Sequence, residues 1–112
     1  MSVSWAYIYE HPGTDPVGDR TVVDRGGQRA LLVPVPTAAS AADVARTLVE
    51  EDGVTLVELC GGFTSADVAQ VAGSLPHHVA VGHVTFAADA LAAAVAYSGA
   101  AAAAIESAGR TG

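Results

Sequence analysis

The stretch that decides the fold is "VTLVELCGGFTSADV", residues 54–68. Its first half is an apolar run rich in valine and leucine, which is typical of a buried strand. Two glycines follow, and then comes a helix start at Thr64 or Ser65, with Asp67 in the first turn. The segment therefore predicts a strand, a tight turn and a helix. It also leaves a charged acid, Glu58, at the exit of an apolar strand.

Strands and helices alternate along the chain from residue 30 onward. The expected strands cover residues 3–9, 30–35, 54–60 and 77–86, with a short strand-like piece near 21–25, and the expected helices begin near residues 40, 64 and 88. Such alternation predicts a parallel sheet with right-handed crossovers. We therefore expect one α/β domain over residues 1–112, with a small, open, mostly parallel sheet of four or five strands and helices packed on it. This fold is flavodoxin-like but shorter; a ferredoxin-like fold would need back-to-back strands in its middle.

Local signals refine this outline at three places. Pro34 removes a backbone donor, so its strand is expected at a sheet edge or near the strand's end there. Ser40, with Asp43 three residues on, predicts a helix cap. The segment "EHPGTDPVGDR", residues 10–20, is a long loop for so small a domain, and such loops are often functional or mobile.

The composition excludes several classes of partner. Apolar residues make up 51% of the 112 residues, the formal net charge is −7, and all five basic residues are arginines. An acidic chain without basic clusters argues against nucleic acid or an anionic membrane as a partner. A single cysteine forms no internal disulfide, and the N-terminus lacks the pattern of a signal peptide. The sequence predicts a soluble cytoplasmic protein.

The segment "FAADALAAAVAYSGAAAAAIE", residues 86–106, is the longest apolar stretch. It contains Asp89 and Glu106 and consists mostly of alanine, so a buried or interface helix is expected rather than a membrane span. Its few bulky side chains and many small ones favour close packing on the sheet or against a neighbouring protomer, and we expect a homo-oligomer.

Ligands of open parallel sheets bind beyond the carboxyl ends of the strands. Gly61 and Gly62 lie at such a position, where a tight turn and the N–H groups of the next helix can receive an anion or a carbonyl oxygen. Phe63 and Thr64 complete this predicted ligand site. The chain has neither phosphate-loop nor dinucleotide fingerprint, so no cofactor is predicted.

Glu58 and His83 are the candidate acid and base. If their strands lie side by side with matching heights, the carboxylate and the imidazole meet and can transfer protons to and from a substrate. Thr85 shares a strand face with His83, and Tyr9 offers an aromatic wall. The alternative is that Glu58 is a hydrogen-bonded acid at a strand end and that His83 faces solvent.

Cys60 is a candidate nucleophile, because a helix N-terminus lowers the pKa of a thiol. A cysteine phosphatase would require an arginine where this chain has Ala66, and a buried, inert cysteine is the common alternative. Metal binding has little support: His77 and His78 are adjacent and point apart on a strand, so no metal site is predicted.

The segment "VELCGGF", residues 57–63, followed by a capped helix and the strand "VAVGHVTF", residues 79–86, resembles an uncharacterised bacterial family of small α/β proteins. The motif "ELCGGF" carries the resemblance, which spans most of the chain. It implies the α/β fold and a shared pocket. It implies no chemistry, because that family is a domain of unknown function.

Two functional hypotheses follow. The first is a cofactor-independent lyase, isomerase or cyclase that acts on a small carbonyl or carboxylate metabolite, with Glu58 and His83 moving protons and the glycine turn holding an oxyanion. The second is a non-catalytic module for ligand binding or homo-oligomeric assembly. The two differ in whether Glu58 and His83 converge on a pocket.

Overall fold

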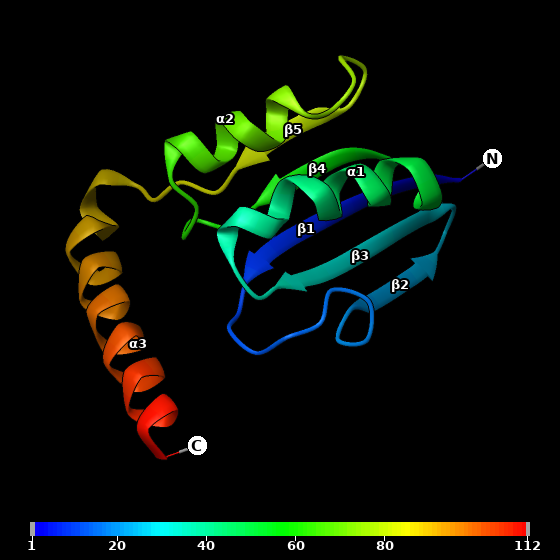
Figure 1. Ribbon diagram of the computed structural model, residues 1–112. Helices are drawn as coiled ribbons and strands as arrows, with labels where there is room; N and C mark the ends of the chain where they lie inside the picture. The colour runs from blue at the N-terminus through cyan, green and yellow to red at the C-terminus, as the bar shows by residue number, and fades with distance from the viewer. Residues whose placement is uncertain (1, 112) are drawn as a thin grey trace.

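Five strands form one sheet in the order β2-β3-β1-β4-β5 in the computed structural model, which describes residues 2–111 and the side chains of residues 2–109 (Figure 1). The strands are β1 (Val3–Glu10), β2 (Thr21–Arg25), β3 (Gln28–Val35), β4 (Val54–Leu59) and β5 (Ala80–His83). β3, β1, β4 and β5 run parallel, and β2 pairs antiparallel with β3. The predicted α/β fold with a mostly parallel open sheet is confirmed.

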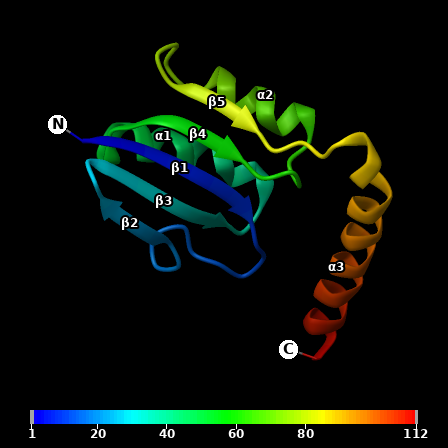
Figure 2. The same cartoon turned by 180° about the vertical axis from the view of Figure 1, so that it is seen from behind.

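Helices α1 (Ala41–Asp52) and α2 (Ser65–Gly73) provide the crossovers from β3 to β4 and from β4 to β5. Both lie on the same face of the sheet, in front of it in Figure 1 and behind it in Figure 2. The core fills the space between them. Its buried side chains are Ala6, Ile8, Leu31, Val33, Val35, Ala41, Ala42, Ala45, Leu48, Val54, Val57, Leu59, Phe63, Val71 and Val79.

The opposite face of the sheet carries no helix among the elements that the structure describes, and we call it the open face (Figure 2). The cause lies in the connection from β1 to β3, where a parallel sheet normally has a crossover helix. Here the chain runs through a loop, residues 11–20, and then through the hairpin of β2 and β3, so this crossover contains no helix. Side chains at alternate positions of β1, β3 and β4 are therefore left uncovered.

The long loop before β2 is tied to the domain by ion pairs. Asp52, at the end of α1, accepts a bond from Arg20 at 3.5 Å and one from Arg29 at 3.0 Å. These two guanidinium groups compensate a carboxylate at the helix end where the helix dipole disfavours negative charge. The loop also folds on itself, because the Asp15 carboxylate accepts from the Gly18 N–H.

Local expectations met three different outcomes. Pro34 lies near the end of β3, as predicted, and beyond Leu32, the last β3 residue that pairs with β2. The edge of β3 that faces β2 therefore needs no N–H donor at Pro34. Ser40 is the N-cap residue of α1 and Asp43 lies in its first turn, as predicted, but the Ser40 hydroxyl donates to the carbonyl of Thr37 and makes no cap bond. The Glu10 carboxylate instead accepts from the Ala38 N–H at 2.6 Å, at the start of the short 3-10 helix η1 (Ala38–Ser40).

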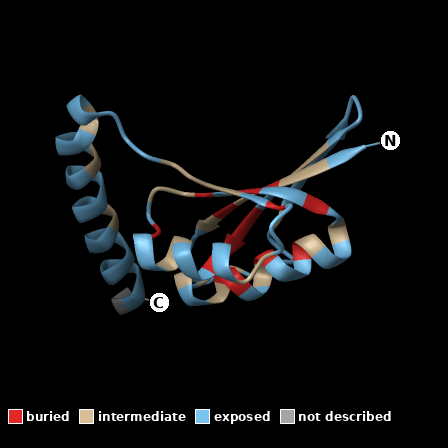
Figure 3. Cartoon of the chain, turned by 90° about the horizontal axis from the view of Figure 1, so that it is seen from above, coloured by how far each residue is buried: buried red, intermediate tan, exposed pale blue. Residues whose placement is uncertain are grey.

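Helix α3 (Leu91–Thr111) follows the 3-10 helix η2 (Ala88–Ala90) and stands past the carboxyl ends of the strands (Figures 1 and 3). Nearly all of its described residues are exposed. Alanine has the highest helix propensity, which explains how a helix with so little packing persists. Residues 88–109 are also long and apolar enough to cross a membrane, by length and composition alone.

Candidate functional site

The structure places the side chains of the proposed acid and base on opposite faces of the sheet. In the register of β4 and β5, Glu58 pairs with Gly82 and Leu59 pairs with His83. Paired residues of neighbouring strands share a face and successive residues alternate. Glu58 therefore points to the open face and His83 toward the helix-covered face, so they are not cross-strand neighbours. Both residues nevertheless line one hollow of about 230 Å³, together with Gly82 and Val84.

His83 is partly buried. Its Nε2 atom is buried and has no hydrogen-bond partner among the described residues. An unpaired buried nitrogen costs stability, although the residue itself lines the hollow beside Glu58. The expectation that His83 faces solvent at the sheet edge does not hold for this atom either.

In the glycine turn, the packing of a neighbouring side chain explains why position 61 is a glycine. A Cβ atom on Gly61 would lie 2.9 Å from Cε2 of the Phe86 ring, and one on Gly62 would lie 3.7 Å from the Cys60 sulfur. Neither glycine has a positive φ angle. Gly61 thus gives Phe86 room, and the turn needs no left-handed conformation to form.

The other predicted residues of the turn have structural roles. Phe63 is only 3% exposed and belongs to the core, so it does not face a ligand. Thr64 is the N-cap of α2, as predicted: its hydroxyl accepts from the Asp67 N–H at 3.1 Å, and the Asp67 carboxylate accepts from the Thr64 N–H at 2.9 Å. The lone pairs of the Thr64 hydroxyl are thus already engaged in part.

Of the remaining candidates, Cys60 and Tyr9 both lie near Tyr7, whereas Thr85 lies beyond the end of β5. Cys60 is partly buried against the core. Thr85 is exposed beyond the end of β5. Tyr9 stacks on Tyr7, with 6.1 Å between ring centroids and 26° between ring planes. Tyr9 belongs to the face that also carries Glu58, because it lies two residues after Tyr7, the register partner of Glu58.

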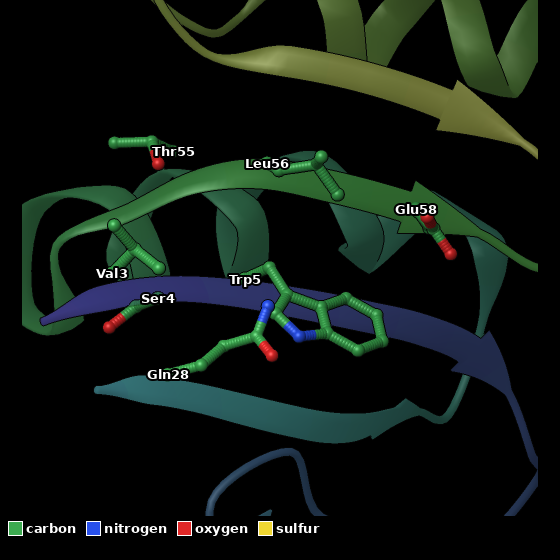
Figure 4. Close-up of a pocket in the computed structure, with 7 residues that line it drawn as sticks. All are labelled: Val3, Ser4, Trp5, Gln28, Thr55, Leu56 and Glu58. Atoms are coloured by element: carbon green, nitrogen blue, oxygen red, sulfur yellow. The ribbon is translucent and has the colours of Figure 1, made fainter. Parts of the chain in front are cut away.

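A shallow groove of about 300 Å³ lies on the open face beside Glu58. In Figure 4 the indole ring of Trp5 occupies its middle, with the Gln28 amide on one side and the Glu58 carboxylate on the other. Strands β1, β3 and β4 all contribute to it. The lining residues are Val3, Ser4, Trp5, Gln28, Thr55, Leu56 and Glu58.

Glu58 is exposed and has no hydrogen bond or ion pair with the part of the chain that the structure describes. A second hollow, of about 230 Å³, adjoins it where Gly82 has no side chain. Tyr7 is its register partner on β1. Burial raises the pKa of the Tyr7 hydroxyl above its ordinary value, and the neighbouring Cys60 and Glu58 raise it further. Tyr7 thus holds its proton to a higher pH than an ordinary tyrosine.

Trp5, Gln28 and Leu56 were not predicted as site residues. Each reads as an ordinary strand residue in the sequence, and only the register of three strands brings them together. One signal was available: the segment between β1 and β3 has no helical pattern, so one face of the sheet had to lack its usual cover.

The fold and the groove define a small α/β protein with one uncovered sheet face. Residues 3–99 match the family of unknown function DUF6506, and the chain belongs to this family. The resemblance to a family of unknown function is thus confirmed. No curated protein and no solved structure matches the chain significantly.

Proposed function

We propose that the protein binds a small molecule in the groove of the open face. One observation carries this proposal: the exposed carboxylate of Glu58, which has no hydrogen-bond or ion-pair partner among the described residues, lies at the end of a groove that has the ring of Trp5 in its middle. Ligand sites typically combine an aromatic or apolar wall with few polar groups that orient the ligand. The groove's volume of about 300 Å³ suits a ligand of low molecular mass.

The chemistry of the groove favours a planar ligand with an amine or another hydrogen-bond donor. A cation above an indole ring is attracted by the ring's electrons, and an ionised carboxylate strengthens a bond from a charged donor. Arg20 and Arg29 are both engaged by Asp52, away from the groove. A carboxylate metabolite, expected from the glycine turn, would meet the negative charge of Glu58 and therefore fits less well.

Tyr7 favours a second candidate function, a cofactor-free lyase, isomerase or cyclase. Proton transfer needs a base and an acid near one substrate, and His83 points to the other face of the sheet from Glu58. Tyr7 is in register with Glu58 on the same face and retains its proton. In this variant of the proposal Glu58 removes a proton and the Tyr7 hydroxyl returns one. Tyr7→Phe should then stop conversion of a bound ligand and leave its affinity nearly unchanged.

Trp5 makes the binding proposal directly measurable, because it is the only tryptophan of the chain. We would titrate the protein with planar aromatic amines, each matched with a carboxylate of the same shape, and follow the Trp5 fluorescence. The amines should change the signal and the carboxylates should not. Glu58→Gln should weaken amine binding by about fivefold or more, as expected for loss of a charge-assisted bond.

Glu51→Gln is the matched control, because it removes the same charge from an exposed position on α1, on the other side of the sheet. It should leave the affinity unchanged. Equal effects of Glu51→Gln and Glu58→Gln would show that only the net charge matters. That result, or tighter binding of the carboxylates, would overturn the proposal.

A further inference from the structure

We propose that two copies of the chain form a symmetric dimer in which helix α3 of each copy lies on the open face of the other. Within each copy, α3 and the open face are two apolar surfaces that do not cover one another (Figure 3). The dimer stands independently of the ligand. Only its consequence for the groove, described below, rests on the proposed function.

The open face requires a cover. Parallel sheets occur almost only with both faces covered, and here α1 and α2 cover one. On the other face large apolar side chains remain in contact with water: Val3 is 56% exposed, and Leu32 and Leu56 are each 38% exposed. Contiguous apolar surface of this kind marks an interaction site.

Helix α3 has an apolar side of matching character. Leu91, Val95 and Ile105 recur at spacings of four and ten residues, which places them along one side of the helix. Val95 is 72% exposed, and the other two are about half exposed. Alanine and serine lie between them, so another surface can approach this side closely.

The helix is not packed tightly within its own chain. A cavity of about 740 Å³ separates it from residues 10–13, and it stands at the end of the strands rather than over the open face (Figure 3). Of the apolar side, Ile105 lines this cavity, whereas Leu91 and Val95 do not. The part of the side that Leu91 and Val95 form therefore remains available to a second copy.

The area suffices for a stable dimer. A helix of 21 residues is about 31 Å long. A contact strip about 10 Å wide buries roughly 300 Å² on each surface, so two reciprocal contacts bury roughly 1,200 Å², the lower end of the range for stable interfaces. The sheet is roughly 19 Å across, so the helix covers about half of it. Because Val3 and Leu56 also line the groove, the helix overlies that end of the groove and leaves the end at Glu58 open.

A membrane is the competing partner for α3. Its hydropathy comes mostly from alanine, which gains little from transfer into lipid, and insertion would leave the open face uncovered. A second copy covers both apolar surfaces, the apolar side of α3 and the open face. We therefore argue for the dimer and let the experiment include the membrane.

The first test measures the molar mass of the full chain by light scattering after gel filtration, without ligand. The wild-type chain should have the mass of two copies and should dissociate on dilution. Val95→Glu should shift the mass to one copy, because it places a charge in the interface. Ala100→Glu, on the opposite side of α3, is the matched control and should remain dimeric. A wild-type monomer at every concentration, or a dimer unaffected by Val95→Glu, would overturn the proposal.

The second test locates the contact by cross-linking, in a Cys60→Ser background that removes the native thiol. Val95→Cys and Leu32→Cys chains are mixed and treated with a short bis-maleimide. A linked pair should form from the mixture and from neither variant alone. A link within one chain of the double variant would place α3 on its own sheet, and a link in a single variant would indicate helix-to-helix or sheet-to-sheet contact. Each of these contradicts the proposal, as does binding of the wild-type chain to neutral phospholipid vesicles that Val95→Glu abolishes.

The two proposals fail separately. The molar-mass and cross-linking measurements are made without ligand, and the Trp5 fluorescence titration does not depend on the oligomeric state being known. Loss of the dimer with an intact ligand response would refute only the dimer, whereas a dimer that binds none of the amines would refute only the proposed function.

Discussion

The ring of Phe86 lies against Gly61, and this contact can be tested directly. A Cβ on Gly61 would lie 2.9 Å from Cε2 and 3.1 Å from Cζ of the ring. Gly61→Ala should therefore lower the free energy of unfolding by about 1 kcal/mol as the ring is displaced. In a Phe86→Ala background the same change should cost nothing, because alanine is tolerated at negative φ and restricts the unfolded chain.

Urea denaturation of the wild type, Gly61→Ala, Phe86→Ala and the double variant gives the coupling energy between positions 61 and 86. Gly62→Ala is the control, because the nearest atom to its Cβ is the Cys60 sulfur at 3.7 Å, an ordinary contact. A cost at Gly61 that persists without the Phe86 ring would mean that the backbone itself requires glycine there.

Tyr7 should make the protein less stable in alkaline solution. Its folded-state pKa lies above the ordinary value of 10.0, first through burial and then through Cys60 and Glu58. Above pH 10 the folded state therefore holds the proton that the unfolded state has lost, and the contribution to stability, complete below pH 10, declines as the pH rises through the folded pKa. Tyr7→Phe should remove this decline.

Tyrosinate absorbance is the measurement for Tyr7. The chain has no lysine, so no ammonium side chain titrates in the same range. Glu58→Gln should lower the midpoint of the Tyr7 transition, whereas Tyr97→Phe, on the exposed α3, should leave it in place. An unchanged midpoint in Glu58→Gln would show that the two side chains do not interact.

At the scale of the element, α2 depends on its capping box. Thr64→Ala removes the acceptor of the Asp67 N–H and should cost about 1 kcal/mol of unfolding free energy, and Thr64→Ser should restore most of it. Ser65→Ala, one residue along and exposed, should change nothing. If thermal or urea unfolding gave equal results for the two alanine variants, the cap would contribute no stability.

The same element shows why part of the fold was predictable. The start of α2 is encoded within four residues, and the period of apolar residues marks each strand, so the order of elements followed from local sequence. The acceptor before α1 was not predictable in this way, because Glu10, which accepts from the Ala38 N–H, comes from β1, distant in the chain. β5 covers residues 80–83 rather than 77–86, because a turn precedes it and the chain leaves the sheet after His83.

The site was less predictable than the fold, for a reason of register. Glu58 could be singled out locally, as a charge in an apolar run. Its neighbours could not, because a shift of one residue between strands turns every side chain to the other face. The prediction placed His83 beside Glu58, but His83 pairs with Leu59, one residue further along β4. This difference of one residue turns the side chains of Glu58 and His83 to opposite faces of the sheet.

At the scale of the whole molecule, the core is complete without α3. The core cluster and the side chains packed on it end at Val81, so a chain that ends at residue 87 should fold. At concentrations where the full chain is monomeric, the free energy of unfolding of this shortened chain should match that of the full chain within about 1 kcal/mol, since exposed residues contribute little.

Circular dichroism of the shortened chain should show loss of about half the helical signal, because α3 has 21 residues against 12 in α1 and 9 in α2. A chain that ends at residue 78 is the control and should unfold, since it lacks Val79 and β5. If the chain of 87 residues failed to fold under conditions where the full chain is a folded monomer, α3 would have to stabilise the sheet of its own copy, which contradicts the exchange of helices between copies.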